Sequence, residues 1–423
     1  MLSQISEDFY QRFKASLERF APFEEKPTIA VGISGGVDSL ALTFLLKRWV
    51  DDRGGYLMAL HVDHGLRKTS KQEALQVKEW LDAHGIENHT LAWDHNNPQT
   101  SLQERARHAR YDLLTGFCRT HHILHLCVAH HLEDQAETIA YRASRGSGPD
   151  GLAGMSFVEE FEDVRLLRPL LDFSKKELKV CLGDHPHIED PSNMDPRFWR
   201  GRFRTQNTAP QKMEPHTEDR TATEQSVALA LYQYTVLSEL GYATVDKGLF
   251  EAESREVQRR VIEKILTTVG GHSYPVRSTV VETLLSKLES TFSQATAGGC
   301  LVRHVKDHIL FVREWSRIQD CHKIHTDEAF SWDGRFHIEP NFPLAQDLCC
   351  KALGDVGWLQ IKGHLKTQPL PHTFYKGLPA FFDERGEVIF CPFGDFKKPE
   401  RMVDLANVRF RPRSRLLRSI WFS

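Results

Sequence analysis

No uninterrupted apolar run in this sequence approaches the roughly 18 residues of a membrane-spanning helix, so no membrane span is expected. The eight cysteines are scattered, and the one close pair, Cys349 and Cys350, has the spacing neither of a disulfide framework nor of a metal site. A signal peptide is not expected either, because apolar residues recur at helical spacing between Phe9 and Phe20, which predicts an amphipathic helix. Together these absences predict a cytoplasmic protein.

The sequence also lacks a strong excess of charge of either sign. It has 54 Lys and Arg against 57 Asp and Glu, a net charge of −3. Any surface for a nucleic acid must therefore be a local basic patch. The length of 423 residues allows two or three domains, and neither internal repeats nor low-complexity tracts are found.

The stretch around which the chain is organised, residues 28–46, reads TIAVGISGGVDSLALTFLL. Its β-branched start, residues 28–33, predicts a buried strand, and its apolar end, residues 40–46, predicts a helix. Between them lie Ser34, Gly35, Gly36, Val37, Asp38 and Ser39. A strand that turns through two glycines into a helix points backbone N–H groups at one spot, where the helix dipole favours phosphate. The turn therefore predicts a phosphate-binding loop.

The residues of the turn refine this prediction. No lysine follows the glycines, so the turn is not a Walker A loop. Asp38 and phosphate repel each other, and a carboxylate beside phosphates indicates a bridging Mg²⁺. Gly35 and Gly36 permit positive φ angles and a close approach that a Cβ would block, and Ser34 and Ser39 add hydroxyl donors. The alternative is a glycine-rich turn that binds nothing, which the flanking strand and helix disfavour.

Strands and helices alternate through the first 150 residues. Further strands are expected at residues 56–62, 87–93 and 123–129, and helices at residues 71–84, 101–118 and 133–145. This spacing predicts an α/β fold with a doubly wound parallel sheet. The ligands of such sheets bind at the carboxyl ends of the strands, where the polar motifs of this chain fall.

Two polar motifs close expected strands. Residues 61–67, HVDHGLR, are either a solvated turn or a ligand contact. His130 and His131 end a later strand, and Glu133 and Asp134 begin the next helix. Acidic residues commonly cap a helix, whereas imidazoles at a strand end can hydrogen-bond a nucleotide or move a proton.

Two arginines and a glycine-rich loop complete the candidates. Arg107 and Arg110 are three residues apart in an expected helix and share a face, either as solvated or acid-paired side chains or as a phosphate clamp. The loop at residues 145–155, RGSGPDGLAGM, suits packing over a ligand.

The organising turn resembles the PP-loop of the N-type ATP pyrophosphatases, which cleave ATP to AMP and pyrophosphate while adenylating a substrate oxygen. Across residues 34–204 the motifs HVDHGLR, ARHARY, AHHLEDQAET, RGSGPDGLAGM, RPLL and EDPSN follow in one order. This series resembles the tRNA(Ile)-lysidine synthetase family. The family pattern has two adjacent aspartates after the histidines, and Glu133 stands in place of the first. Glu133 is therefore either a metal ligand or a helix cap, and we favour the cap.

The resemblance implies an ATP-dependent ligase. Such an enzyme joins free L-lysine to C2 of the wobble cytidine of tRNA(Ile) with a CAU anticodon, through an adenylated tRNA and with release of AMP and pyrophosphate. ATP and Mg²⁺ are the implied cofactors, and the oligomeric state stays open, with a homodimer as one option.

The resemblance also implies the roles of individual residues. Asp38 and Asp134 would hold the metal, Arg107 and Arg110 would stabilise charge at the α-phosphate, and the base is open between His131 and Asp134. The implied ATP contacts are Ser34, Gly35, Gly36, Val37, Asp38, Ser39, His61, Asp63 and His130. The implied tRNA contacts in the arginine run after EDPSN are Arg200, Arg202 and Arg204.

The remaining chain divides by composition. We expect a PP-loop domain at residues 1–208, a linker at residues 208–226, a mostly helical substrate and tRNA-binding domain at residues 227–320 and a β-rich domain at residues 331–423. The basic tail, residues 397–418, is either a tRNA contact or an ordinary surface strand.

Two rival functions remain open. A tRNA thiolase would use the same adenylation, but related cytidine thiolases carry paired cysteines, and no CxxC occurs here. A nucleotide-binding or tRNA-binding protein without catalysis is the other rival, which Glu133 keeps open.

Overall fold

The computed structural model describes residues 5–65, 70–93, 102–145, 152–161, 163–189, 217–290, 293–324, 328–341, 348–364, 370–392, 405–416 and 419–420. The chain forms two compact units. The first comprises residues 1–222 and 418–423, and the second comprises residues 223–417. In the described part of the chain, no helix is both long and apolar enough to cross a membrane.

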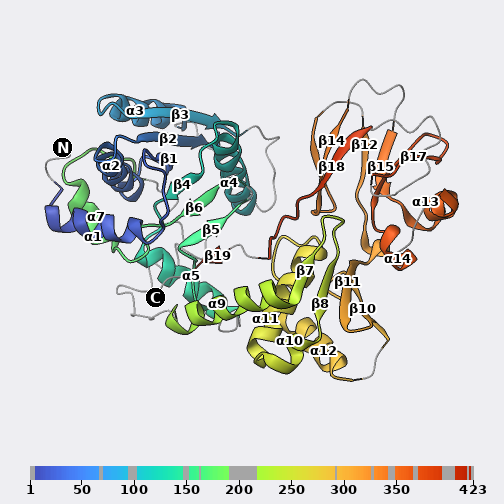
Figure 1. Ribbon diagram of the computed structural model, residues 1–423. Coiled ribbons are helices and arrows are strands. Elements are labelled where there is room, and N and C mark those ends of the chain that lie inside the picture. Colours follow the sequence, from blue (N-terminus) through green and yellow to red (C-terminus); the bar gives the residue numbers. More distant parts are fainter. Residues whose placement is uncertain are drawn as a thin grey trace. The chain divides into compact units, whose positions relative to one another are not determined.

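A seven-stranded sheet in the order β19-β5-β6-β4-β1-β2-β3 is the centre of the first unit (Figure 1). Five adjacent strands are parallel: β6 (Arg165–Leu167), β4 (His125–Val128), β1 (Thr28–Ile33), β2 (Tyr56–Asp63) and β3 (Glu87–Ala92). At one edge β5 (Val158–Glu160) and β19 (Ser419–Ile420) are antiparallel.

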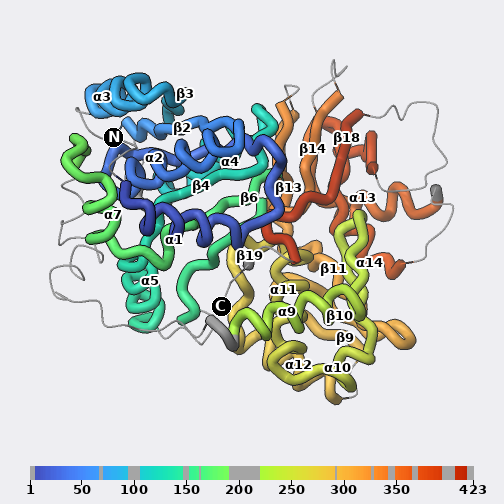
Figure 2. The backbone as a smooth tube through the Cα atoms, turned by 60° about the vertical axis from the view of Figure 1, so that its left-hand side comes forward, coloured from blue at the N-terminus to red at the C-terminus, as the bar shows by residue number. Residues whose placement is uncertain are grey.

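Helices cover both faces of this sheet, because successive residues of a strand point to opposite sides. On one face Ile29, Val31 and Ile33 of β1 pack with α1 (Glu7–Glu18), α2 (Val37–Asp51), α3 (Ser70–Asp82) and α7 (Lys175–Leu182). On the other face Ala30 packs with α4 (Leu102–Thr120). Figure 2 shows α1 and α2 side by side. The predicted α/β fold with a doubly wound parallel sheet is confirmed.

The order in which the chain adds strands to the sheet reverses at β1. From there β2 and β3 follow on one side, and β4 and β6 lie on the other. The carboxyl ends of β1 and β4 are therefore neighbours at a topological switch point, where ligands of open α/β sheets bind. The helix that follows β4, α5 (Leu132–Ser144), starts at this edge.

The second unit begins inside α9 (Thr217–Tyr234), where we expected a linker. Both prolines of that stretch, Pro210 and Pro215, precede the helix, so no breaker interrupts it. Glu224 of α9 also pairs with Arg260 at 2.9 Å and with Lys264 at 3.3 Å. The prediction of a linker up to Ser226 is therefore wrong.

A five-stranded antiparallel sheet, β7-β8-β11-β10-β9, follows α9. Its strands are β7 (Thr235–Leu237), β8 (Ala243–Asp246), β9 (Gln294–Ala297), β10 (Cys300–Val305) and β11 (His308–Arg313). The helices are α10 (Gly248–Ala252), α11 (Arg255–Val269) and α12 (Ser278–Leu288). The segment thus combines helices with a sheet, and β10 and β11 form the hairpin expected near residues 299–312.

Two smaller antiparallel sheets form the rest of the second unit. One contains β12 (Cys321–Ile324), β15 (Leu348–Ala352), β16 (Pro379–Phe382) and β17 (Val388–Phe390). The other contains β13 (Phe330–Trp332), β14 (Phe336–Pro340) and β18 (Ala406–Phe410). The short helices are η3 (Trp315–Arg317), α13 (Gly354–Ile361), η4 (Lys362–His364) and α14 (His372–Tyr375). The expected β-rich character of this region is confirmed.

Candidate active site

The loop between β1 and α2 has the backbone of a phosphate site. Gly35 has φ +81° and so uses the freedom of a glycine, whereas Gly36 has φ −76°, an angle open to any residue. Gly36 is the N-cap of α2 and provides no side chain to cap it. The first-turn N–H groups of α2 consequently have no side-chain cap and can meet an anion.

The two loop serines differ in what their hydroxyls do. The Ser39 hydroxyl donates to the Gly36 carbonyl at 3.0 Å and accepts from the Ser34 N–H at 3.2 Å. Ser39 is buried and Ser34 is exposed. Ser39 therefore shapes the turn from inside, while the exposed Ser34 hydroxyl lies at its surface.

Ile188 packs on the same loop, a contact that the sequence reasoning missed. Its N–H donates to the Gly35 carbonyl at 2.9 Å. A Cβ atom at Gly35 would lie 2.7 Å from Ile188 Cδ1 and 2.6 Å from Val77 Cγ2. Nothing local in the sequence signals this contact except that Ile188 directly precedes the EDPSN motif.

His131 brings the predicted catalytic residues together across the sheet edge. It follows β4, is 3% exposed, and places its Nε2 atom 3.5 Å from Asp38 Oδ2 and 3.5 Å from Asp134 Oδ2. Asp134 Oδ2 also accepts the His131 backbone N–H at 3.2 Å. Residues nearly 100 positions apart, in the β1–α2 loop and at the start of α5, thus meet at one imidazole.

The charge state of His131 follows from this environment. Burial disfavours the imidazolium, but hydrogen bonds to Asp38 and Glu133 and the charge of Asp134 outweigh it and raise the pKa of His131 to about 10. Both ring nitrogens of the protonated form face carboxylates. While Asp38 and Asp134 carry no metal, such a ring has no nitrogen ready to accept a proton.

Glu133, the departure from the family pattern, turns away from the two aspartates. Its Oε2 atom accepts from His131 Nδ1 at 2.9 Å and from the backbone N–H of Lys175 at 2.9 Å. Lys175 is the first residue of α7. The carboxylate therefore holds His131 and caps the N-terminus of α7. The sequence prediction places the cap on α5 and does not include this link to α7.

Asp38 and Asp134 are the two carboxylates here that could share a Mg²⁺. Among the described residues Asp38 Oδ1 is buried and has no hydrogen-bond partner. The same residues contain no group of three or more His, Cys, Asp or Glu side chains arranged for a metal. Mg²⁺ needs about six oxygen ligands, so phosphate and water oxygens would have to complete its shell. This arrangement suits a metal that arrives with a nucleotide.

The other predicted ATP contacts lie at the neighbouring strand ends. His61 lies in β2, two residues before its end at Asp63, and burial lowers its pKa, which favours the neutral imidazole. Asp63 Oδ1 accepts the Gly65 N–H at 2.8 Å, so this carboxylate at least shapes the turn. His130 is half-buried directly after β4.

The two arginines of α4 do not act alike. Arg107 is exposed, and its guanidinium lies 5.4 Å from the centre of the Tyr111 ring. Arg110 is half-buried, with Nη2 3.7 Å from the position of a Cβ on Gly32 of β1. Burial lowers its pKa, and no carboxylate of the described chain forms an ion pair with it. Arg110 is thus a cation against the sheet that lacks an anionic partner within the described residues.

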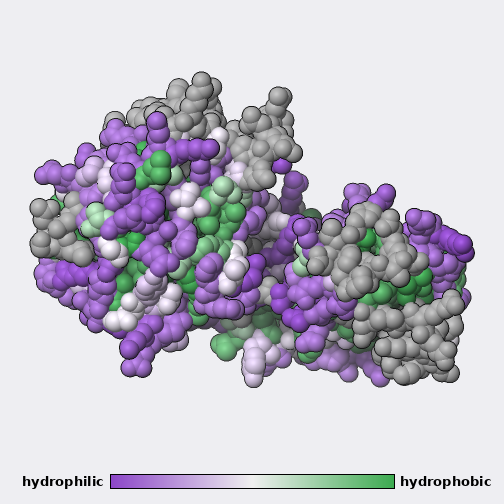
Figure 3. All heavy atoms as spheres, turned by 90° about the horizontal axis from the view of Figure 1, so that it is seen from above, coloured by the Kyte–Doolittle hydropathy of each residue, from purple (hydrophilic) through white to green (hydrophobic). Residues whose placement is uncertain are grey.

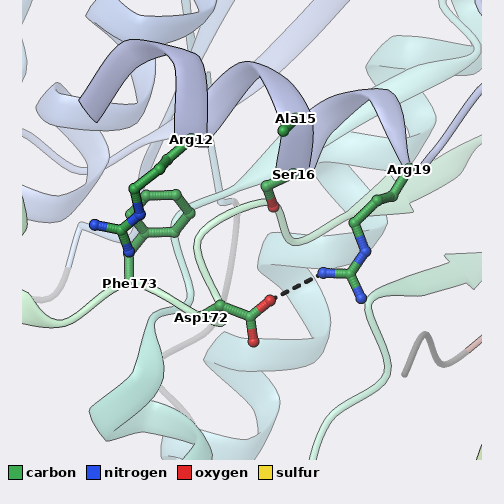
Figure 4. Close-up of a pocket in the computed structure, with 6 residues that line it drawn as sticks. All are labelled: Arg12, Ala15, Ser16, Arg19, Asp172 and Phe173. Carbon is green, nitrogen blue, oxygen red and sulfur yellow. Dashed lines mark hydrogen bonds and ion pairs between the residues drawn. The ribbon is translucent and has the colours of Figure 1, made fainter. Parts of the chain in front are cut away.

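A separate pocket lies between α1 and the residues before α7 (Figure 4). Its two arginines are occupied: Arg19 pairs with Asp172 at 3.0 Å, and Arg12 pairs with Glu177 at 2.8 Å. Phe173 lies under the Arg12 guanidinium. None of the predicted site residues lines this pocket, and its paired charges do not favour an anion. The visible face of the first unit is mainly polar, with separate apolar patches (Figure 3).

Some predicted site residues lie outside the described residues. These are Arg200, Arg202 and Arg204 and most of the glycine-rich loop, residues 146–151.

The family model of the PP-loop domain matches residues 6–210. The first unit therefore belongs to the PP-loop class of ATP-binding domains, in agreement with the loop between β1 and α2. The chain is also similar to curated tRNA(Ile)-lysidine synthases.

Three relatives span most of the chain. The tRNA(Ile)-lysidine synthase of Orientia tsutsugamushi (strain Boryong) is 32% identical, with 78% of this chain and 79% of the relative covered. That of Wolbachia pipientis wMel is 33% identical, with 84% of each chain covered. That of Bradyrhizobium sp. (strain BTAi1 / ATCC BAA-1182) is 35% identical, with 70% of this chain and 90% of the relative covered. The chain belongs to the tRNA(Ile)-lysidine synthase family.

Proposed function

We propose that this protein is a ligase that adenylates the wobble cytidine of tRNA(Ile) with a CAU anticodon and then joins free L-lysine to its C2 atom. Family membership supports the reaction. The observation that carries it in the structure is the meeting of Asp38 and Asp134 at His131, beside the open N-terminus of α2. We propose that the protein is cytoplasmic, because these substrates are found in the cytoplasm.

The proposed chemistry first gives C2 of cytidine a better leaving group. C2 of cytidine is a poor electrophile, because its carbonyl oxygen is a bad leaving group. Transfer of AMP from ATP to that oxygen releases pyrophosphate and converts the oxygen into part of AMP, a good leaving group. The deprotonated ε-amine of lysine then attacks C2, and AMP departs.

We assign the phosphates to the β1–α2 loop, where Gly35 and the first turn of α2 present backbone N–H groups. Asp38 and Asp134 would hold Mg²⁺, with Asp38 Oδ1 as the atom that lacks a protein partner among the described residues. The ion would neutralise phosphate charge and stabilise the departing pyrophosphate.

Arg110 is our candidate for the cation that stabilises charge at the α-phosphate. It is held against β1 beside Gly32 and has no anionic partner in the described chain. A preorganised cation in a partly dry site stabilises developing negative charge more strongly than one in water. Arg107 is exposed and is therefore better suited to the RNA backbone or the outer phosphates. The base for the lysine amine stays open between His131 and Asp134.

We assign tRNA binding to Arg200, Arg202 and Arg204 of the first domain, residues 1–208, and to the later domains, residues 227–320 and 331–423. In the described part of the basic tail, Arg409, Arg413 and Arg415 are exposed on or just after β18. Exposed arginines at this density suit a phosphate backbone.

The test is AMP release by the purified protein with the CAU-anticodon tRNA(Ile), in the presence and absence of lysine. We expect AMP to form with this tRNA and labelled lysine to enter it only when ATP is present. The same tRNA with uridine at the wobble position is the matched control and should give neither product. AMP formation with incorporation of sulfur instead of lysine would indicate a thiolase, and no AMP under any condition would indicate a binding protein.

A further inference from the structure

Two cysteines on neighbouring strands of the second unit place their sulfur atoms together. Cys321 is the first residue of β12, Cys349 is the second residue of β15, and their Sγ atoms are 2.6 Å apart. The strands are adjacent and antiparallel in the four-stranded sheet (Figure 1). This juxtaposition lies in the unit that does not contain the PP-loop and is independent of the proposed ligase chemistry.

The register of the sheet puts both thiols on its solvent side. Cys321 is opposite Lys351, and Lys323 is opposite Cys349, so these four side chains share one face. Cys321 is exposed and Cys349 is half-buried, whereas Cys350 on the other face is 0% exposed. The cysteine pair is therefore accessible, unlike most cysteines of the chain.

We propose that Cys321 and Cys349 are a reversible redox site that closes to an intramolecular disulfide. A disulfide has an S–S length of about 2.05 Å, so the sulfurs need to approach by only about 0.5 Å. The oxidant would be a low-molecular-weight disulfide. Two thiols lose two protons and two electrons as their S–S bond forms, and the oxidant is reduced to two small thiols.

Each of the two sulfur atoms carries out one step of the thiol–disulfide exchange. The exposed Cys321 thiolate attacks the small disulfide, releases one small thiol and forms a mixed disulfide. Cys349 then attacks the Cys321 sulfur and releases the second small thiol. Burial, followed by the hydrogen bond with Cys321, raises the pKa of Cys349 to about 11, so its thiol stays protonated near neutral pH. In the mixed disulfide the Cys321 thiol is gone, and Lys351 and Lys323 remain to favour the thiolate.

Closure would tie together parts of the second unit. The bond encloses about 30 residues, including β13 and β14. Because a disulfide constrains the unfolded chain, the oxidised protein should unfold at a temperature higher by about 5 °C or more.

The test exposes the full-length protein to glutathione buffers from fully reduced to fully oxidised and maps disulfides by mass spectrometry of unreduced peptides. In the wild type we expect a peptide pair joined through Cys321 and Cys349, reversed by reduced glutathione, together with the rise in unfolding temperature. Cys349→Ser should instead hold glutathione on Cys321, and Cys321→Ser should form no bond at Cys349. Cys181→Ser, at the other half-buried cysteine, should behave as the wild type.

Three results would overturn the proposal. They are free thiols at both positions in fully oxidised glutathione, a wild type that retains glutathione on Cys321 without closure, and joined peptides that leave the unfolding temperature unchanged. The wild-type measurements decide the question by themselves if a serine variant does not fold.

Discussion

The carboxylate of Glu133 accepts a hydrogen bond from the imidazole of His131, with 2.9 Å between Oε2 and Nδ1. The same oxygen accepts the Lys175 N–H, so the imidazole is held to the N-terminus of α7. This contact directs the other ring nitrogen, Nε2, towards Asp38 and Asp134. We therefore propose that Glu133 positions His131 against the two carboxylates assigned to the metal, and metal coordination is not required to explain it.

Glu133→Asp should lower AMP formation without changing the need for Mg²⁺. The shorter side chain cannot reach both donors, and loss of one hydrogen bond to a charged group corresponds to about a tenfold loss of rate. A Mg²⁺ titration of AMP formation compares this variant with the wild type and with Glu79→Asp, at an exposed position of α3. A several-fold shift in the Mg²⁺ concentration for half-maximal activity would make Glu133 a metal ligand after all.

Asp38→Asn and Asp134→Asn should each reduce AMP formation by orders of magnitude, on the order of 1,000-fold, and leave the fold intact. Each change removes an anionic ligand while keeping the shape of the side chain. Asp51→Asn is the control, because Asp51 lies at the opposite end of α2 and pairs only with Lys47 among the described contacts. Circular dichroism and AMP release are the measurements. Normal adenylation by Asp38→Asn would refute the proposed metal site.

Gly35→Ala should destabilise the β1–α2 loop by about 1–3 kcal/mol, because φ is +81° and the new Cβ would meet Val77 and Ile188. Gly36→Ala is the matched control for stability, since its φ is −76° and its nearest neighbours would be at 3.6 and 3.8 Å. Urea unfolding measures both. Adding Ile188→Ala to Gly35→Ala should recover only part of the loss, because the φ angle remains. Full recovery would mean that packing alone requires the glycine.

Glu177→Gln should destabilise the protein at neutral pH and by less in acid. Burial opposes ionisation of Glu177, yet hydrogen bonds from Arg12 and Ser174 outweigh it and lower its pKa from 4.5 to about 2. A lowered folded-state pKa contributes stability above pH 4.5 that is lost as the pH falls towards 2. We expect a difference of about 1 kcal/mol at pH 7, after screening by solvent, that shrinks towards pH 3. Urea unfolding measures this difference in stability. If it stays constant across the pH range, the ionised carboxylate of Glu177 is not its cause.

Replacement of Arg409, Arg413 and Arg415 by alanine should weaken binding of full-length tRNA and flatten its salt dependence. Each lost phosphate contact lowers the slope of log affinity against log salt by about 0.7–0.9. Adenylation of an isolated anticodon stem-loop should hardly change, because we assign the chemistry to the first unit. Arg385→Ala, in the turn between β16 and β17, is the single-charge control. Unchanged affinity for tRNA at low salt would identify the tail as ordinary surface.

The sequence by itself determined the parallel sheet, the loop between β1 and α2 and the edge at which the site lies. These features are local, because strand and helix have different apolar periods and because a strand that turns through Gly35 into a helix exposes N–H groups wherever the chain goes next. The carboxyl ends of β1, β2 and β4 then meet as a consequence of parallel order.

Only the tertiary structure decided the contacts between residues far apart in the chain. Glu133 with Lys175, Gly35 with Ile188 and Cys321 with Cys349 are such pairs. In none of these pairs does the sequence around one residue predict the other, because a contact across tens of residues depends on how whole elements pack. The same reason applies to α9. Its polar sequence resembles a linker, but in the structure Glu224 forms an ion pair with Arg260 of α11.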